Sequence, residues 1–132
     1  MRLIHALAAA SLLATGAAAP AKPENPEAKL ARLLDGRVPG KPVSCIDFHR
    51  VRSSQIIDHT AIVYDAGSTL YVNRPTAGLS SLDGWDYMVS TPSVSQICNV
   101  DIVHLVDKGT HIENGSISLG QFVPYQRANR RR

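Results

Sequence analysis

From residue 43 onward, short runs of β-branched and aromatic residues alternate with clusters of Gly, Pro, Asn, Asp and Ser. Apolar runs of this length, interrupted at such close intervals, are typical of strands joined by turns. We therefore predict a mainly β fold, a small antiparallel β-barrel or sandwich of about 6–7 short strands. The strands are expected in the segments VSCIDF, SQIID, TAIVYD, TLYVN, DYMVS, DIVHLV and SISLGQFVPY.

Turn residues within this region predict two hairpins. YDAGSTLY is expected to reverse near Ala66-Gly67, and HIENGSISL at Asn114-Gly115. An Asn-Gly pair tolerates the positive φ angles of a two-residue loop better than other pairs. Asn114-Gly115-Ser116 also matches a glycosylation acceptor, but the turn is the preferred interpretation.

Residues 22–42 form a Pro-rich linker that contains one short helix. Asn25 suits the N-cap, Pro26 suits the first helical position and Gly36 suits the position just past the end. Between them Leu30, Leu33 and Leu34 make one apolar stripe at helical spacing. A helix this short is not stable alone, so the stripe must dock, and we expect it to dock on the sheet of its own domain rather than on an outside partner.

Residues 1–21 have the layout of a secretory signal peptide. Arg2 is followed by an apolar run from residue 3 to 19 and by small residues that allow cleavage after Ala21. A retained anchor is the alternative, but a run of about 17 mostly Ala residues is shorter than a spanning helix needs. We expect no stable membrane anchor, and a mature chain of residues 22–132 with a single β domain at 43–126.

The positive charge of the chain is concentrated at its C-terminus. The sequence has 14 Lys and Arg against 11 Asp and Glu, and RANRRR at residues 127–132 holds four of those cations. We predict a disordered basic tail at 127–132, with contact to an anionic surface as the alternative. Aromatic residues are scarce and no RNA-binding or zinc-finger signature occurs, so nucleic acid is not an expected partner.

The two cysteines, Cys45 and Cys98, predict a disulfide. An exported domain meets an oxidising compartment, where two thiols become a bridge unless a metal or a catalytic role protects them. In this interpretation Asp47 and His49, which follow Cys45 in SCIDFHR, are surface residues beside the bridge.

A metal site is the alternative for the same residues. Cys45 and His49 supply potential ligands in one segment, and Cys98, Asp101 and His104 supply them in another. These spacings match no zinc module, because structural zinc sites usually contain paired ligands such as C-x2-C or H-x3-H. We therefore predict the disulfide, with no metal and no cofactor.

Several segments together resemble an uncharacterised family of small exported proteobacterial proteins, a domain of unknown function. The resemblance covers about residues 43–125 and lies in CID, RSSQIID with TAIVYD, LYVNRP, QICNVDIVHLVD and LGQFVPY. It implies an exported protein and brings no activity, ligand or partner. Family members often have a second cysteine pair before Gly78-Leu79 and before Leu119-Gly120, where this chain has neither cysteine.

No catalytic residues are predicted. The chain contains no G-x-S-x-G, HExxH, phosphate-binding loop or dinucleotide motif. Asp58-His59 is interpreted as a turn rather than a catalytic pair, and His104 as a hydrogen-bonded or exposed strand residue. Arg50 and Arg52 could bind an anion, but a solvated basic face is the preferred interpretation.

The sequence thus predicts an exported protein, periplasmic or secreted, that acts as a binding or accessory module in the envelope with an unidentified protein partner. An inhibitor of an envelope enzyme is one alternative. A metal-dependent or hydrolytic enzyme is the alternative from another class.

Overall fold

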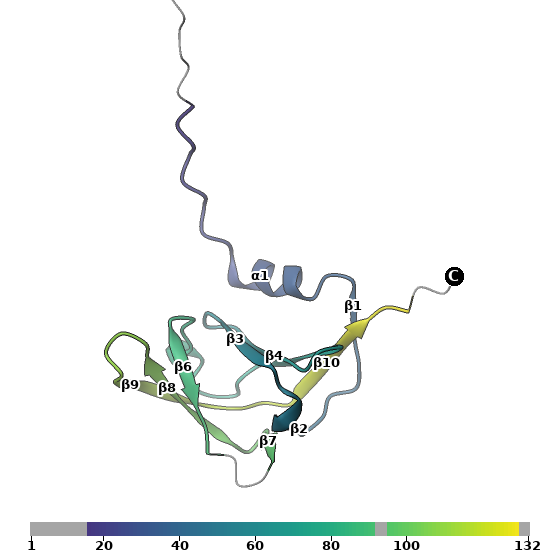
Figure 1. Ribbon diagram of the computed structural model, residues 1–132. Coiled ribbons are helices and arrows are strands. Elements are labelled where there is room, and N and C mark those ends of the chain that lie inside the picture. Colours follow the sequence, from purple (N-terminus) through teal and green to yellow (C-terminus); the bar gives the residue numbers. More distant parts are fainter. Residues whose placement is uncertain (1–15, 92–94, 130–132) are drawn as a thin grey trace, which may run out of the picture.

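The computed structural model describes residues 16–91 and 95–129, and Figure 1 shows the arrangement of its elements. Most of the expected signal peptide and the last three residues of the expected tail lie outside the described residues, and residues 16–21 form neither helix nor strand. The elements in chain order are α1 (Pro26–Leu33), β1 (Arg37–Pro39), β2 (Cys45–Asp47), the 3-10 helix η1 (Phe48–Arg50), β3 (Ser53–Ile57), β4 (Ala61–Asp65), β5 (Thr69–Asn73), the 3-10 helix η2 (Leu79–Ser81), β6 (Asp86–Val89), β7 (Gln96–Cys98), β8 (Ile102–Asp107), β9 (Glu113–Ser118) and β10 (Phe122–Arg127).

The mainly β prediction is confirmed, with more strands than expected. In the described part of the chain, ten strands form three antiparallel sheets and do not close into a barrel. The five-stranded sheet has the order β1-β10-β5-β4-β3, the three-stranded sheet has the order β6-β8-β9, and β2 pairs with β7. β1 and β7 are the strands that the sequence pattern did not predict.

The N-terminal helix forms where the sequence predicts it. The Asn25 side chain accepts a hydrogen bond from the Glu27 amide at 2.9 Å, and the chain leaves the helix through Gly36 at φ 71°. Leu30 is 3% exposed and packs in a core cluster with residues of β3, β4 and β5. The stripe therefore docks on the protein's own sheet. No helix in residues 16–91 and 95–129 is long and apolar enough to cross a membrane.

Strand β4 is buried on both faces of the five-stranded sheet, which explains its uninterrupted apolar run. Successive side chains of a strand point to opposite faces. Ile62 and Tyr64 accordingly face the main core, whereas Ala61 and Val63 face α1. In Figure 1, α1 lies above this sheet and the three-stranded sheet lies to its left.

The main core joins all three sheets. β2 and β7 contribute one buried isoleucine each, and Phe122 from β10 is fully buried against Tyr64, with ring centroids 5.7 Å apart. Burial raises the pKa of the Tyr64 hydroxyl well above its usual range. The cluster consists of Ile46, Ile56, Ile62, Tyr64, Leu82, Ile97, Val103, Leu105, Ile117, Leu119 and Phe122.

The segment SISLGQFVPY, predicted as one strand, is two strands of different sheets. β9 ends at Ser118, and three residues that belong to no strand, 119–121, separate it from β10, which begins at Phe122. The side chain of Asn73, which is fully buried, donates to the Gly120 carbonyl at 2.6 Å and accepts from the Gly120 amide at 2.9 Å. The amide and the carbonyl of Gly120 are therefore both hydrogen-bonded. A side chain at this position is excluded, because a Cβ at Gly120 would clash with the Arg74 carbonyl.

The first predicted hairpin is confirmed. The turn between β4 and β5 contains Gly67 at φ 84°, and the Asp65 carboxylate accepts from the Gly67 amide at 2.7 Å.

The second predicted turn is wrong, because Asn114-Gly115 lies inside β9. The chain reverses five residues earlier, where Asp107 accepts three hydrogen bonds from Gly109 and Thr110. These bonds, chiefly those from Thr110, lower the pKa of the Asp107 carboxyl. Asn114 is instead the extra residue of a β-bulge.

The structure shifts two predicted boundaries. β1 lies within the segment expected to be a linker and pairs with β10, with Arg37 opposite Arg127. Arg127, the first residue of the expected tail, is therefore the last residue of a strand.

The docking of α1 on the sheet makes a testable prediction. Leu30→Ala should lower the free energy of unfolding by about 2–5 kcal/mol, because it leaves a cavity under the helix. Ala31→Ser, at an exposed position of the same helix, should cost about 0.5 kcal/mol or less. Urea denaturation of both variants measures the difference, and equal costs would show that the helix contributes little to the core.

Candidate functional site

The predicted disulfide is present. Cys45 of β2 and Cys98 of β7 stand directly opposite each other and are bonded. The neighbouring pair, Ile46 and Ile97, is buried in the main core. Both sulfur atoms are used by the bridge, so neither is available as a thiolate ligand. The bond indicates an oxidising compartment outside the cytoplasm.

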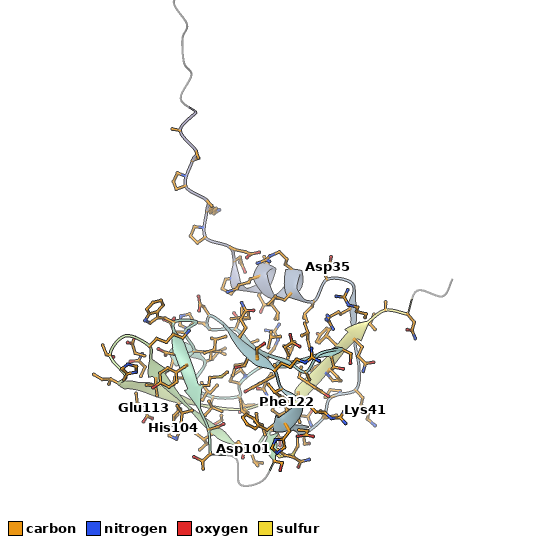
Figure 2. The ribbon with its side chains drawn as sticks, viewed as in Figure 1. Asp35, Lys41, Asp101, His104, Glu113 and Phe122 are labelled. Carbon is orange, nitrogen blue, oxygen red and sulfur yellow. A yellow bond between two sulfur atoms is a disulfide. The ribbon has the colours of Figure 1, made fainter. Side chains whose placement is uncertain are left out.

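The other residues considered as metal ligands are separately engaged. Asp101 accepts a hydrogen bond from the Cys98 amide at 2.7 Å, and Asp47 accepts one from the His49 amide at 2.9 Å, which caps η1. His104 pairs with Glu113, with Nδ1 and Oε1 2.6 Å apart, on the outer face of the three-stranded sheet (Figure 2). Among the described residues, no group of three or more His, Cys, Asp and Glu is placed to hold a metal ion.

Arg50 and Arg52 do not form a shared anion site in this structure. Arg50 is largely exposed and lies 3.8 Å from the Asp47 carboxylate. The Arg52 guanidinium lies over Gly67 in the β4-β5 turn.

Asp58-His59 forms a turn, as predicted, and this turn ties the two larger sheets together. His59 adopts φ 50°, and its amide donates to the Leu82 carbonyl at 2.8 Å. Asp58 Oδ1 accepts from the Gly84 amide at 2.6 Å. The segment that leads into β6 is thereby fixed to the end of β3.

Beyond this connection, the edges of β3 and β6 border a groove of about 550 Å³. β3 is the last strand of the five-stranded sheet, and β6 is an edge strand of the three-stranded sheet. Both strands therefore direct one row of backbone amides and carbonyls away from their sheets. The groove is lined by Lys29 of α1, Ser54, Gln55 and Ile56 of β3, and Asp58, Asp83, Gly84, Trp85, Asp86, Tyr87, Met88 and Lys108.

One wall of the groove contains a buried carboxylate. Asp86 is 4% exposed, and its Oδ1 accepts a hydrogen bond from the Asn114 side chain at 3.0 Å. Its Oδ2 is buried and has no hydrogen-bond partner in the described part of the chain. The β-bulge in β9 explains the Asn114 contact, because a bulge redirects the side chain of the extra residue.

Two exposed aromatic residues, Trp85 and Tyr87, line the groove on the side of the three-stranded sheet. Trp85 is 63% exposed, and its backbone is held by a hydrogen bond from its amide to Asp83 Oδ1 at 2.8 Å. Tyr87 is also exposed. Apolar surface of this kind, next to a polar groove, is typical of a binding site.

Sequence reasoning missed this groove. Its one local signal was the segment DGWD at residues 83–86, which places the single tryptophan of the chain between acidic residues. The approach of β3 to β6 depends on tertiary structure and has no sequence motif.

Comparison of the chain with family models, with curated proteins and with solved structures finds no match in any of the three. The resemblance to the family of small exported proteins therefore stays a prediction. Ala77 and Ser118, the positions where that family often has a second cysteine pair, are antiparallel bridge partners here.

The disulfide makes a second testable prediction. Replacing Cys45 and Cys98 by serine should lower the free energy of unfolding by roughly 4 kcal/mol, because the bridge closes a long loop in the unfolded chain. Chemical denaturation of the oxidised protein and the double variant measures this loss. The oxidised protein should contain no free thiol, and two reactive thiols would contradict the bridge.

The hydrogen bond from the Gly84 amide to Asp58 gives a third testable prediction. Asp58→Ala leaves the Gly84 amide without its acceptor, so we expect a loss of about 1–2 kcal/mol and faster hydrogen exchange of that amide. Asp35→Ala, at an exposed position beyond the end of α1 (Figure 2), should change stability by about 0.5 kcal/mol or less. If the two variants behave alike, the bond does not hold the groove.

Proposed function

We propose that the protein is an exported binding domain, periplasmic or secreted, that takes an extended segment of a protein partner into the groove between β3 and β6. The observation that carries the proposal is that one groove is bordered by edge strands of two different sheets. An edge strand recruits an extended peptide by main-chain hydrogen bonds, and side-chain pockets then add specificity.

The lengths and exposure of the two strands suit this mode of binding. β3 has five residues and β6 has four, and Ser53, Ser54 and Gln55 of β3 are all exposed. A strand has backbone groups on both of its edges. A bound segment can therefore pair with β3 on one edge and with β6 on the other, and so connect the two sheets.

The groove has the dimensions of a ligand site. Its volume of about 550 Å³ lies within the range of about 300–1,000 Å³ that small-ligand sites occupy. The signal-like N-terminus and the disulfide support a partner met outside the cytoplasm. Inhibition of an envelope enzyme is one form that such binding could take, with a loop or terminus of the enzyme as the bound segment.

A peptide selection tests the proposal. Residues 22–132 are used to select binders from a displayed library of short random peptides, and hydrogen exchange is then measured with a selected peptide. We expect slower exchange in residues 53–55 and 87–89. A peptide with N-methyl groups on alternate residues should bind at least about tenfold more weakly, because it lacks backbone donors on one edge.

A matched pair of variants locates the binding. Ser54→Tyr places a ring in the groove from an exposed position and should abolish binding. Val100→Tyr enlarges a residue that is 82% exposed and does not line the groove, so it should leave binding unchanged. Binders that are insensitive to Ser54→Tyr, or a selection that yields none, would refute the proposal.

A further inference from the structure

We propose that the groove recognises a positively charged side chain, lysine or arginine, of the segment it binds. This inference rests on the proposed function and adds the chemical class of the recognised residue. The cationic group would lie at the exposed carboxylate of Asp83, close to the buried carboxylate of Asp86, and its aliphatic stem would lie against Trp85.

Asp86 is the main reason to expect a cation. A carboxylate that is 96% buried has lost most of its contact with water, and a buried charge is costly unless it is paired. Only one of its oxygens is engaged, by the neutral amide of Asn114. A guanidinium or ammonium group in the groove supplies an opposite charge close to this carboxylate, and the attraction between them is screened weakly because Asp86 is shielded from water.

Two further carboxylates in the groove are held in the same one-sided manner. Asp58 Oδ1 accepts from the Gly84 amide, and Asp83 Oδ1 accepts from the Trp85 amide. In the described part of the chain these bonds fix both carboxylates through Oδ1, so each still has a second oxygen to accept from a ligand.

The two lysines that line the groove offset only part of its negative charge. Lys108 donates to the Gly84 carbonyl at 3.3 Å, and neither it nor Lys29 takes part in the ion pairs among the described residues. Three carboxylates against two ammonium groups leave the lining with one net negative charge.

Trp85 gives a reason to expect an amino-acid side chain rather than a simple ion. Trp85 is 63% exposed and lines the groove beside the acidic residues. A tryptophan face attracts a cationic head group and also packs on the methylene groups of a lysine or arginine. The carboxylates are not spaced to hold a metal ion in the described residues, which agrees with a larger organic cation.

The experiment compares the peptides selected by three forms of the protein, in the same random library. Asp86→Asn removes the buried charge and retains the shape and the acceptor for Asn114. Asp35→Asn removes an exposed carboxylate beyond α1 and serves as the matched control. We expect lysine or arginine to be enriched at one position by the unaltered protein and by Asp35→Asn, but not by Asp86→Asn.

A direct titration then measures the preference. A peptide selected by the unaltered protein is synthesised with its basic residue as lysine or as uncharged norleucine, and binding is followed by the fluorescence of Trp85, the single tryptophan of the chain. The lysine peptide should bind at least about tenfold more tightly. Asp86→Asn should remove most of that difference, and the exposed variant Asp83→Asn should reduce it.

The outcomes separate this inference from the proposed function. Peptides that protect residues 53–55 and 87–89 but show no basic preference, or the same preference in Asp86→Asn and Asp83→Asn, would overturn the recognition of a cation and leave the groove as a peptide site. If no peptide protects these strands, the proposed function fails, and the inference fails with it. Should Asp86→Asn not fold, the comparison of lysine with norleucine on Asp83→Asn decides the question.

Discussion

The fold depends on one buried amide, the side chain of Asn73, at the point where the chain passes from the three-stranded sheet to the five-stranded sheet. Asn73 bonds to both backbone groups of Gly120. A backbone amide or carbonyl that is buried without a partner costs about 1–3 kcal/mol. Because both groups are satisfied, the chain can break its strand inside the core and place Phe122 against Tyr64.

This crossing determines which strand edges are left open. β9 and β10 are consecutive in the chain but belong to different sheets, so the two sheets are joined near Gly120. They are joined again where Asp58 and His59 bind the segment before β6. Between these connections the edges of β3 and β6 have no partner strand among the described residues. The groove is thus a consequence of how the sheets are connected.

Local sequence patterns predicted the elements whose signals are local. The capped helix at Asn25 and Pro26, the turn at Gly67 and the bridge between Cys45 and Cys98 all follow from short-range chemistry. The Asn114-Gly115 turn was wrong because Asp107 offers the chain an earlier reversal, with its carboxylate bonded to two backbone amides. The break at Gly120 could not be predicted, since it requires Asn73 from a strand 47 residues away. The groove could not be predicted either, because its walls come from strands that are distant in the sequence. Nothing in the sequence around Asp86 indicates that this residue is buried.

The position of β10 has a consequence for the order in which the protein can fold. This last strand lies between β1 and β5, and its residue Phe122 also pairs with Val43 near the start of the domain. A chain that is still emerging from a ribosome or an export channel lacks β10, so its five-stranded sheet remains split and its main core lacks Phe122. Contacts between such distant residues form slowly because a long loop must first close. The complete five-stranded sheet and the full main core therefore form only after nearly the whole length of the chain is free.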